Sequence, residues 1–164
     1  MDAKFFRPDA PEDDFQIRID RNGQWYHRDS PISRAQLAKL FSTVLHRDPK
    51  TNDYWLITPH EQGRIEVEDV PYLVTDYQLD DQTLIFTTSL GHTVTADAEH
   101  TIYCHSETGL PYIHIDNNVS ARLNRSVRDK LIHLALEQDG YDPDTGQLIL
   151  TIDDIMHVIA KDVS

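Results

Sequence analysis

Apolar and polar residues alternate at several places in the first half of the chain, and this alternation predicts β-strands. Residues 15–20 and 24–27 alternate on either side of Asn22-Gly23. Because Asn and Gly tolerate the positive φ of a tight turn, these residues are predicted to form a β-hairpin. A second hairpin is predicted over residues 54–68, with its turn at 59–63.

The second half of the chain is predicted to consist mainly of further strands. Its β-branched and aromatic segments are separated by short polar turns that contain Asp, Gly or Thr. These predicted strands span residues 72–79, 83–88, 92–96, 101–105, 112–115 and 147–152.

Three stretches have the periodicity of an amphipathic helix. The first is predicted over residues 34–46, with Ser33 and Gln36 at the spacing of a capping box. The second is predicted over 126–137, where Val127, Leu131 and Ala135 share one stripe. A short terminal helix is predicted over 153–160.

Two segments share one order of features: a hairpin, an arginine near the start of a helix, the helix, and a strand. The first segment begins with the hairpin around Gly23 and the second with the hairpin around Gly109, and their arginines are Arg34 and Arg122. We interpret this order as a degenerate internal duplication.

The predicted fold is α+β, with two related lobes of antiparallel strands that are each packed by one helix. They cover residues 15–70 and 71–152, and the second is expected to be a strongly bent sheet or partial barrel.

The ends of the chain lie outside these two lobes. Residues 1–14 contain prolines and many acids without periodicity, so a disordered acidic arm is expected there. Residues 153–164 are interpreted as a C-terminal tail.

Charge and composition narrow the classes of function. The 164 residues include 15 Lys and Arg against 28 Asp and Glu, a net charge of −13. Affinity for nucleic acids depends on cations that neutralise phosphates, so nucleic-acid binding is not expected, nor is binding to anionic membranes. With a single cysteine, Cys104, and no apolar core of a signal peptide, a cytoplasmic location is expected.

Several strings of residues resemble a bacterial family, the domain-of-unknown-function family 1285. These strings are Gly23 to His27 followed by Pro31-Ile32-Ser33-Arg34, then residues 40–45, 54–59, 65–72, 111–115 and 121–125. The resemblance covers roughly residues 15–152 and departs at Asp116-Asn117, where the family is expected to have a basic residue. It implies a duplicated fold whose C-terminal half is superficially similar to pleckstrin-homology domains. It also implies a site for a nucleotide-like ligand between the halves and a role in signal transduction.

Arginines are the first candidates for a site, because an acidic protein needs local cations to hold an anion. Arg34 and Arg122 are expected near helix N-termini, where free amides and the helix dipole also favour anions. Arg125 follows three residues after Arg122 and could share its face. Alternatively, each arginine pairs with a carboxylate and fixes the two halves together.

Three further residues are candidates to bind the same ligand. Glu66 and Asp69 could orient a ribose hydroxyl or perform acid–base chemistry, or they could belong to a solvated hairpin face. Trp55 could stack on a base or fill the core. The nine histidines have no metal-ligand spacing, and no nucleophile motif or phosphate-binding glycine loop is present, so no metal or other cofactor is expected.

The sequence therefore predicts a non-catalytic module that binds a small anionic, nucleotide-like ligand, or a regulatory signalling module. Two alternatives remain open. One is a hydrolase or transferase that uses Glu66 and Asp69. The other is a protein-interaction module of the pleckstrin-like type, with a protein partner.

Overall fold

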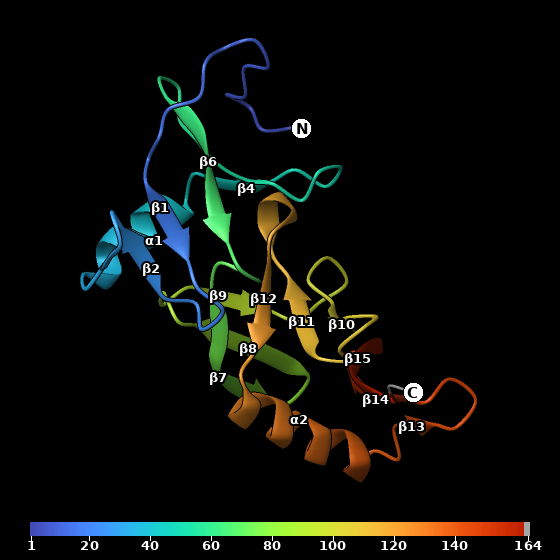
Figure 1. Ribbon diagram of the computed structural model, residues 1–164. Helices are drawn as coiled ribbons and strands as arrows, with labels where there is room; N and C mark the ends of the chain where they lie inside the picture. The colour runs from blue at the N-terminus through green and yellow to red at the C-terminus, as the bar shows by residue number, and fades with distance from the viewer. Residues whose placement is uncertain (163–164) are drawn as a thin grey trace. The chain divides into compact units, whose positions relative to one another are not determined.

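The computed structural model describes residues 1–162, and the chain divides into two compact units (Figure 1). The first unit contains Met1–Tyr72 and the short segment Asp116–Val119. The second contains Leu73–Ile115 and the chain from Ser120 onward. Each unit consists mainly of strands with one α-helix, which confirms the α+β class. No helix in the described part of the chain is both long and apolar enough to span a membrane.

The first unit contains a six-stranded sheet with the order β3-β2-β1-β6-β5-β4. Its central pair, β1 with β6, is parallel, and the other neighbours are antiparallel. Helix α1 connects β3 to β4. The elements are β1 (Ile17–Ile19), β2 (Trp25–His27), β3 (Ser30–Pro31), α1 (Ala35–Ser42), β4 (Leu45–Arg47), β5 (Tyr54–Ile57) and β6 (Gln62–Val67).

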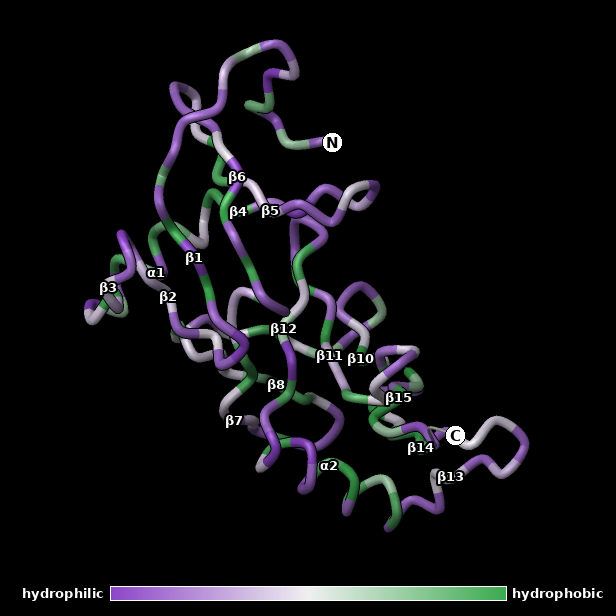
Figure 2. Tube along the Cα trace, viewed as in Figure 1, coloured by the Kyte–Doolittle hydropathy of each residue, from purple (hydrophilic) through white to green (hydrophobic). Residues whose placement is uncertain are grey.

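Hydrophobic and hydrophilic residues alternate along the central strands of the first unit (Figure 2), and burial follows this alternation. Ile17, Ile19 and Ile65 are buried, whereas Arg18 lies on the opposite face of β1. Trp25 fills the same core and is only 1% exposed. Its Nε1–H donates a hydrogen bond of 2.8 Å to the carbonyl of Pro71, so the one polar group of this large core side chain has a hydrogen-bond partner.

The second unit contains a six-stranded sheet and a smaller three-stranded one. The large sheet has the order β10-β11-β12-β7-β8-β9, and the small one has the order β13-β14-β15. Helix α2 (Arg125–Glu137) buries Val127, Leu131 and Ala135 and contacts β14 and β7. The strands are β7 (Leu73–Asp80), β8 (Thr83–Thr88), β9 (Thr93–Thr95), β10 (Ile102–Cys104), β11 (Pro111–His114), β12 (Ser120–Leu123), β13 (Tyr141–Asp142), β14 (Gln147–Ile152) and β15 (Ile155–Lys161). A 3-10 helix, η1 (Asp116–Asn118), belongs to the first unit and contacts β4.

The two large sheets have the same strand order, which supports the two-lobe duplicated fold. In each, a three-stranded meander is followed along the chain by another, and the first strand of one pairs in parallel with the last strand of the other. This topology matches β1 to β7 and β6 to β12. The sequence interpretation instead matched the first hairpin to the β10–β11 hairpin, and that correspondence is wrong. Helix α1 follows the third strand of its sheet, whereas α2 follows the sixth.

The predicted terminal helix over 153–160 is also wrong, because β15 occupies this segment. Asp153 and Asp154 both have positive φ, 51° and 61°, and form the two-residue loop of a tight hairpin. Beyond the loop, His157 and Ile159 are fully buried at a spacing of two, the period of a strand.

Helix α1 is shorter than the predicted 34–46 and lacks the predicted capping box. The N-cap residue is Arg34, and no side chain caps the helix. At the other end, the hydroxyls of Ser42 and Thr43 donate to the carbonyls of Lys39 and Leu40, which helps to end the helix. The chain then enters β4 at Leu45, where it pairs with β5.

Candidate functional site

A hollow of about 290 Å³ opens on the first unit, and we call it the arginine hollow. It is bordered by β1, by the segment that precedes β1, by the turn after β2 and by β6. Three arginines and three acids line it, together with one polar and two apolar residues. The lining residues are Asp14, Gln16, Ile17, Arg18, Arg28, Asp29, Arg64, Ile65 and Glu66.

The parallel pairing of β1 with β6 brings part of this set together. Arg18 and Glu66 are register partners in that pair. Because they alternate with the buried Ile17 and Ile65, their side chains share the solvent face of the sheet. The guanidinium of Arg18 also lies 3.8 Å from the centre of the Tyr26 ring on β2, a cation–π contact that holds it over the sheet.

Backbone conformation places the other side of the hollow. Gln16, Arg28 and Asp29 all have positive φ, between 51° and 63°, which is uncommon for residues other than glycine. The amide of Arg28 donates to the carbonyl of Gln16 at 2.9 Å, which joins the two segments. These left-handed residues turn the chain so that Arg28 and Asp29 border the hollow beside Arg18.

The three arginines differ in their partners. Arg18 forms an ion pair with Asp29 at 3.1 Å. Arg64 donates two hydrogen bonds to the carboxylate of Glu12, of 2.8 and 2.9 Å. Within the described residues, the guanidinium of Arg28 makes no hydrogen bond or ion pair. The hollow thus contains one cation that is not already neutralised by direct contact.

The Arg64–Glu12 pair also shifts the ionisation of both groups. Hydrogen bonding to Arg64 lowers the pKa of Glu12 below its ordinary value, and the same contact raises the pKa of Arg64. Glu12 is therefore a carboxylate at neutral pH, and it occupies the guanidinium fork of Arg64 as the carboxylate of a ligand would.

Arg34, a sequence-predicted site residue, lies at a second hollow of about 250 Å³. It is the N-cap of α1 and lies there with His27, Ser33 and Leu37. The structure does not bring Arg34 to the arginine hollow, whose lining includes Glu66 but not Arg34.

Trp55 and Asp69 lie outside the arginine hollow as well. Trp55 on β5 pairs in register with Arg64, and its ring centre lies 5.6 Å from that guanidinium. Asp69 is half-buried in the loop after β6. Since only Glu66 of the two proposed acid–base carboxylates lines the hollow, the structure does not assemble the carboxylate pair there.

Arg122 and Arg125 belong to the second unit. Arg122 lies within β12, where it pairs with Tyr112 and Leu73, two residues before the N-cap of α2. Arg125 is the first residue of α2, and its side chain is 88% exposed and 3.8 Å from Asp129. At the start of this helix, Asn124 accepts the amide of Val127 and is the N-cap.

The remaining candidate chemistry offers little to a reaction. Burial raises the pKa of the Cys104 thiol to about 11, so the thiol stays protonated near neutral pH. Within residues 1–162, no group of three or more His, Cys, Asp or Glu side chains could hold a metal ion.

Sequence reasoning did not single out Arg18 and Arg28, although both line the hollow. Arg18 could have been found from the alternation of residues 15–20, which places it on the polar face of a predicted strand. No pattern in the sequence marks Arg28, because its position depends on left-handed residues that are not glycine.

Comparisons with known proteins agree with this two-unit architecture. Residues 5–70 match the N-terminal domain of a domain of unknown function, DUF1285, and residues 71–156 match the C-terminal domain of the DUF1285 proteins of unknown function. No curated protein matches the chain.

Two crystal structures are similar to this chain. One is a DUF1285 family protein from Silicibacter pomeroyi DSS-3, with 26% identity and a TM-score of 0.75 over 97% of this chain and 90% of that one. The other is a DUF1285 family protein from Shewanella baltica OS155, with 24% identity and a TM-score of 0.61 over 72% of this chain and 91% of that one. Because the two family domains together span residues 5–156, the chain belongs to the DUF1285 family.

Proposed function

We propose that the first unit binds a small anionic ligand in the arginine hollow. The observation that carries this proposal is Arg28, a lining residue of the hollow whose side chain has no acid partner among the described residues. Its five N–H donors suit the oxygens of a phosphate or carboxylate. Arg18 lines the same hollow, so two arginines border the space that an anion would occupy.

The volume of the hollow limits the ligand. At about 290 Å³ it lies at the lower end of the range for small-molecule sites. This size fits a phosphorylated metabolite or a short dicarboxylate better than a dinucleotide. Glu66 also lines the hollow and is exposed, so its carboxylate could accept a hydrogen bond from a hydroxyl or amine of the same ligand.

The net negative charge of the chain makes the unpaired arginine at the hollow significant for anion binding. The chain has a net charge of −13, so its average field repels anions. An anion would therefore bind only where direct contacts with arginine outweigh that field, and the affinity should fall as salt screens those contacts.

A thermal-shift series tests the proposal. The full chain is titrated with inorganic phosphate, pyrophosphate, adenosine monophosphate and succinate, because a ligand that binds the native state must raise its stability. Arg28→Gln removes the unpaired cation, and Lys50→Gln removes the same charge from an exposed position of the same unit. We expect at least one anion to raise the melting temperature of the wild type and of Lys50→Gln but not of Arg28→Gln. An equal rise in Arg28→Gln, or no rise with any of the four, would contradict the proposal.

A further inference from the structure

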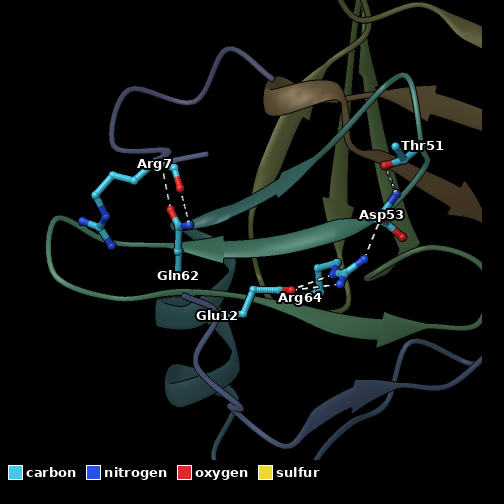
Figure 3. Close-up of polar contacts among 6 residues, drawn as sticks. All are labelled: Arg7, Glu12, Thr51, Asp53, Gln62 and Arg64. Atoms are coloured by element: carbon cyan, nitrogen blue, oxygen red, sulfur yellow. Dashed lines mark hydrogen bonds and ion pairs between the residues drawn. The ribbon is translucent and has the colours of Figure 1, made fainter. Parts of the chain in front are cut away.

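Residues 6–13 lie against β5 and β6, and the side chain of Gln62 holds them by their backbone (Figure 3). The amide of Arg7 donates to Gln62 Oε1 at 2.9 Å, and Gln62 Nε2 donates to the carbonyl of Arg7 at 2.7 Å. Gln62 is 1% exposed, so this carboxamide is fixed in place. A paired contact of this kind recognises the amide and carbonyl of one backbone residue, whatever its side chain. Here the chain turns directly after that residue, because the amide of Ala10 donates to the carbonyl of Arg7 at 3.1 Å.

The backbone of β6 makes a second contact with the same segment. The amide of Asp13 donates to the carbonyl of Gln62 at 2.7 Å, and the amide of Gln62 donates to the carboxylate of Asp13 at 3.1 Å. This approach is close because the next residue is Gly63, where any Cβ would overlap the carbonyl oxygen of Asp13. The strand is thus shaped to accept a polypeptide beside it.

Two side-chain contacts add selectivity. The ring of Phe6 packs edge-on against Trp55, with the ring centres 5.3 Å apart. The carboxylate of Glu12 accepts hydrogen bonds from Nε and Nη2 of Arg64, as described above. The surface therefore recognises an aromatic ring followed six residues later by a carboxylate.

The occupying segment is not part of the core. None of residues 1–14 is buried, and residues 1–16 contain no helix or strand. Glu12 and Arg64 are 38% and 53% exposed, so their ion pair is screened by solvent. Trp55 Nε1 is buried without a hydrogen-bond partner among the described residues, so the segment leaves one donor of this surface unsatisfied.

From these contacts we propose that Trp55, Gln62, Gly63 and Arg64 form a peptide-binding surface, which the chain's own residues 6–13 occupy. Its partner is an acidic segment of another polypeptide that turns between an aromatic residue and a carboxylate six positions later, as residues 6–12 do here. The partner displaces residues 6–13. This inference goes beyond the anion site and does not depend on it, although Arg64 borders both.

A labelled peptide with the sequence of residues 4–14 tests the proposal on the full chain by fluorescence anisotropy. The variant Phe6→Ala/Glu12→Gln removes the contacts of the internal segment with Trp55 and Arg64 and leaves the surface intact. The control Phe5→Ala/Asp9→Asn makes the same two chemical changes at exposed neighbours. We expect the Phe6→Ala/Glu12→Gln chain to bind the peptide at least fivefold more tightly than the wild type or the control.

Two further measurements identify the surface. Adding Arg64→Gln to the Phe6→Ala/Glu12→Gln chain should remove the gain, and so should the substitution Glu12→Gln in the peptide. The proposal is overturned if the peptide binds none of the chains. It is also overturned if all chains bind the peptide equally, or if the gain persists without Arg64.

Discussion

A side chain at Gly63 would overlap the carbonyl oxygen of Asp13, so residue 63 must be glycine for the N-terminal segment to lie on β6. The φ of Gly63 is not in the left-handed region, and its role is to leave space. A Cβ at this position would also lie only 3.0 Å from the ring of Phe15, so the chain is close on more than one side. Packing at this one position therefore couples the first residues of the chain to the sheet.

Gly63→Ala should release residues 6–13 from β6. The added methyl has no room while the carbonyl of Asp13 stays in place, and the segment that contains it has no buried residue to resist displacement. Amide hydrogen exchange at Asp13 should become much faster, because its donor bond to Gln62 is lost. Gly91→Ala serves as the control: it strains a left-handed residue in the second unit, at φ 85°, and should leave exchange at Asp13 unchanged. Slow exchange at Asp13 in Gly63→Ala would show that the contact does not depend on the glycine.

The two tryptophans should respond differently to the same substitution. Trp25→Phe leaves the carbonyl of Pro71 without its donor and opens space in the core, so we expect a loss of about 2–4 kcal/mol in the free energy of unfolding. Trp55→Phe removes a buried N–H that has no partner in the described structure, so its cost should stay within about 1 kcal/mol. Urea denaturation measures both values. Equal costs for the two variants would contradict the assigned role of the Trp25 hydrogen bond.

Helix α2 should depend on its N-cap more than α1 does. Asn124→Ala removes the acceptor of the Val127 amide and should cost about 1 kcal/mol. Arg34→Ala changes an N-cap whose side chain makes no capping bond, so its effect should stay within about 0.5 kcal/mol. Thermal unfolding of the two variants checks this difference, and a larger loss in Arg34→Ala would show that its side chain has a structural role.

His157 should make the folded state sensitive to acid. Burial lowers the pKa of His157, although the charge of Asp97 opposes this shift, and its Nδ1 accepts the amide of Ile102 at 3.1 Å. Below the unfolded pKa of about 6.5, the unfolded chain binds a proton that the folded chain does not, so stability falls as the pH falls. The slope can reach about 1.4 kcal/mol per pH unit for one proton.

The variant His157→Asn keeps an acceptor near the position of Nδ1 and removes the titration. Urea denaturation between pH 7.5 and 5.5 should show a shallower loss of stability than in the wild type. His60→Asn, at an exposed turn, should keep the wild-type slope. Parallel slopes for the wild type and His157→Asn would contradict the role of this histidine.

Local patterns predict much of this fold because many of its contacts are local. The hairpins at 17–27 and 54–67 follow from alternation around short turns, and α2 follows from the spacing of Val127 and Leu131. The tail was misread because the pattern of Ile155, Met156 and Ile159 also fits a helix. The strand forms because two aspartates adopt positive φ, and a preference for this conformation is weak in Asp.

The site was harder to predict because its contacts are long-range. Glu66 is exposed on β6, but its neighbour Arg18 comes from a parallel pairing of strands and lies 48 residues away in the sequence. The partner of Arg64 is Glu12, 52 residues away. No periodic pattern connects such positions. The sequence pattern instead identifies arginines near predicted helix N-termini, which are Arg34 and Arg122.

Amide chemical-shift mapping tests most directly whether an anion binds in the arginine hollow. The ¹⁵N-labelled full chain is titrated with pyrophosphate and its backbone signals are followed. We expect saturable shifts of the amide signals of Arg18, Arg28, Asp29 and Glu66 in the wild type, and no such shifts in Arg28→Gln. Shifts confined to residues 33–37 at the start of α1, or no saturable shift at the hollow, would contradict binding there.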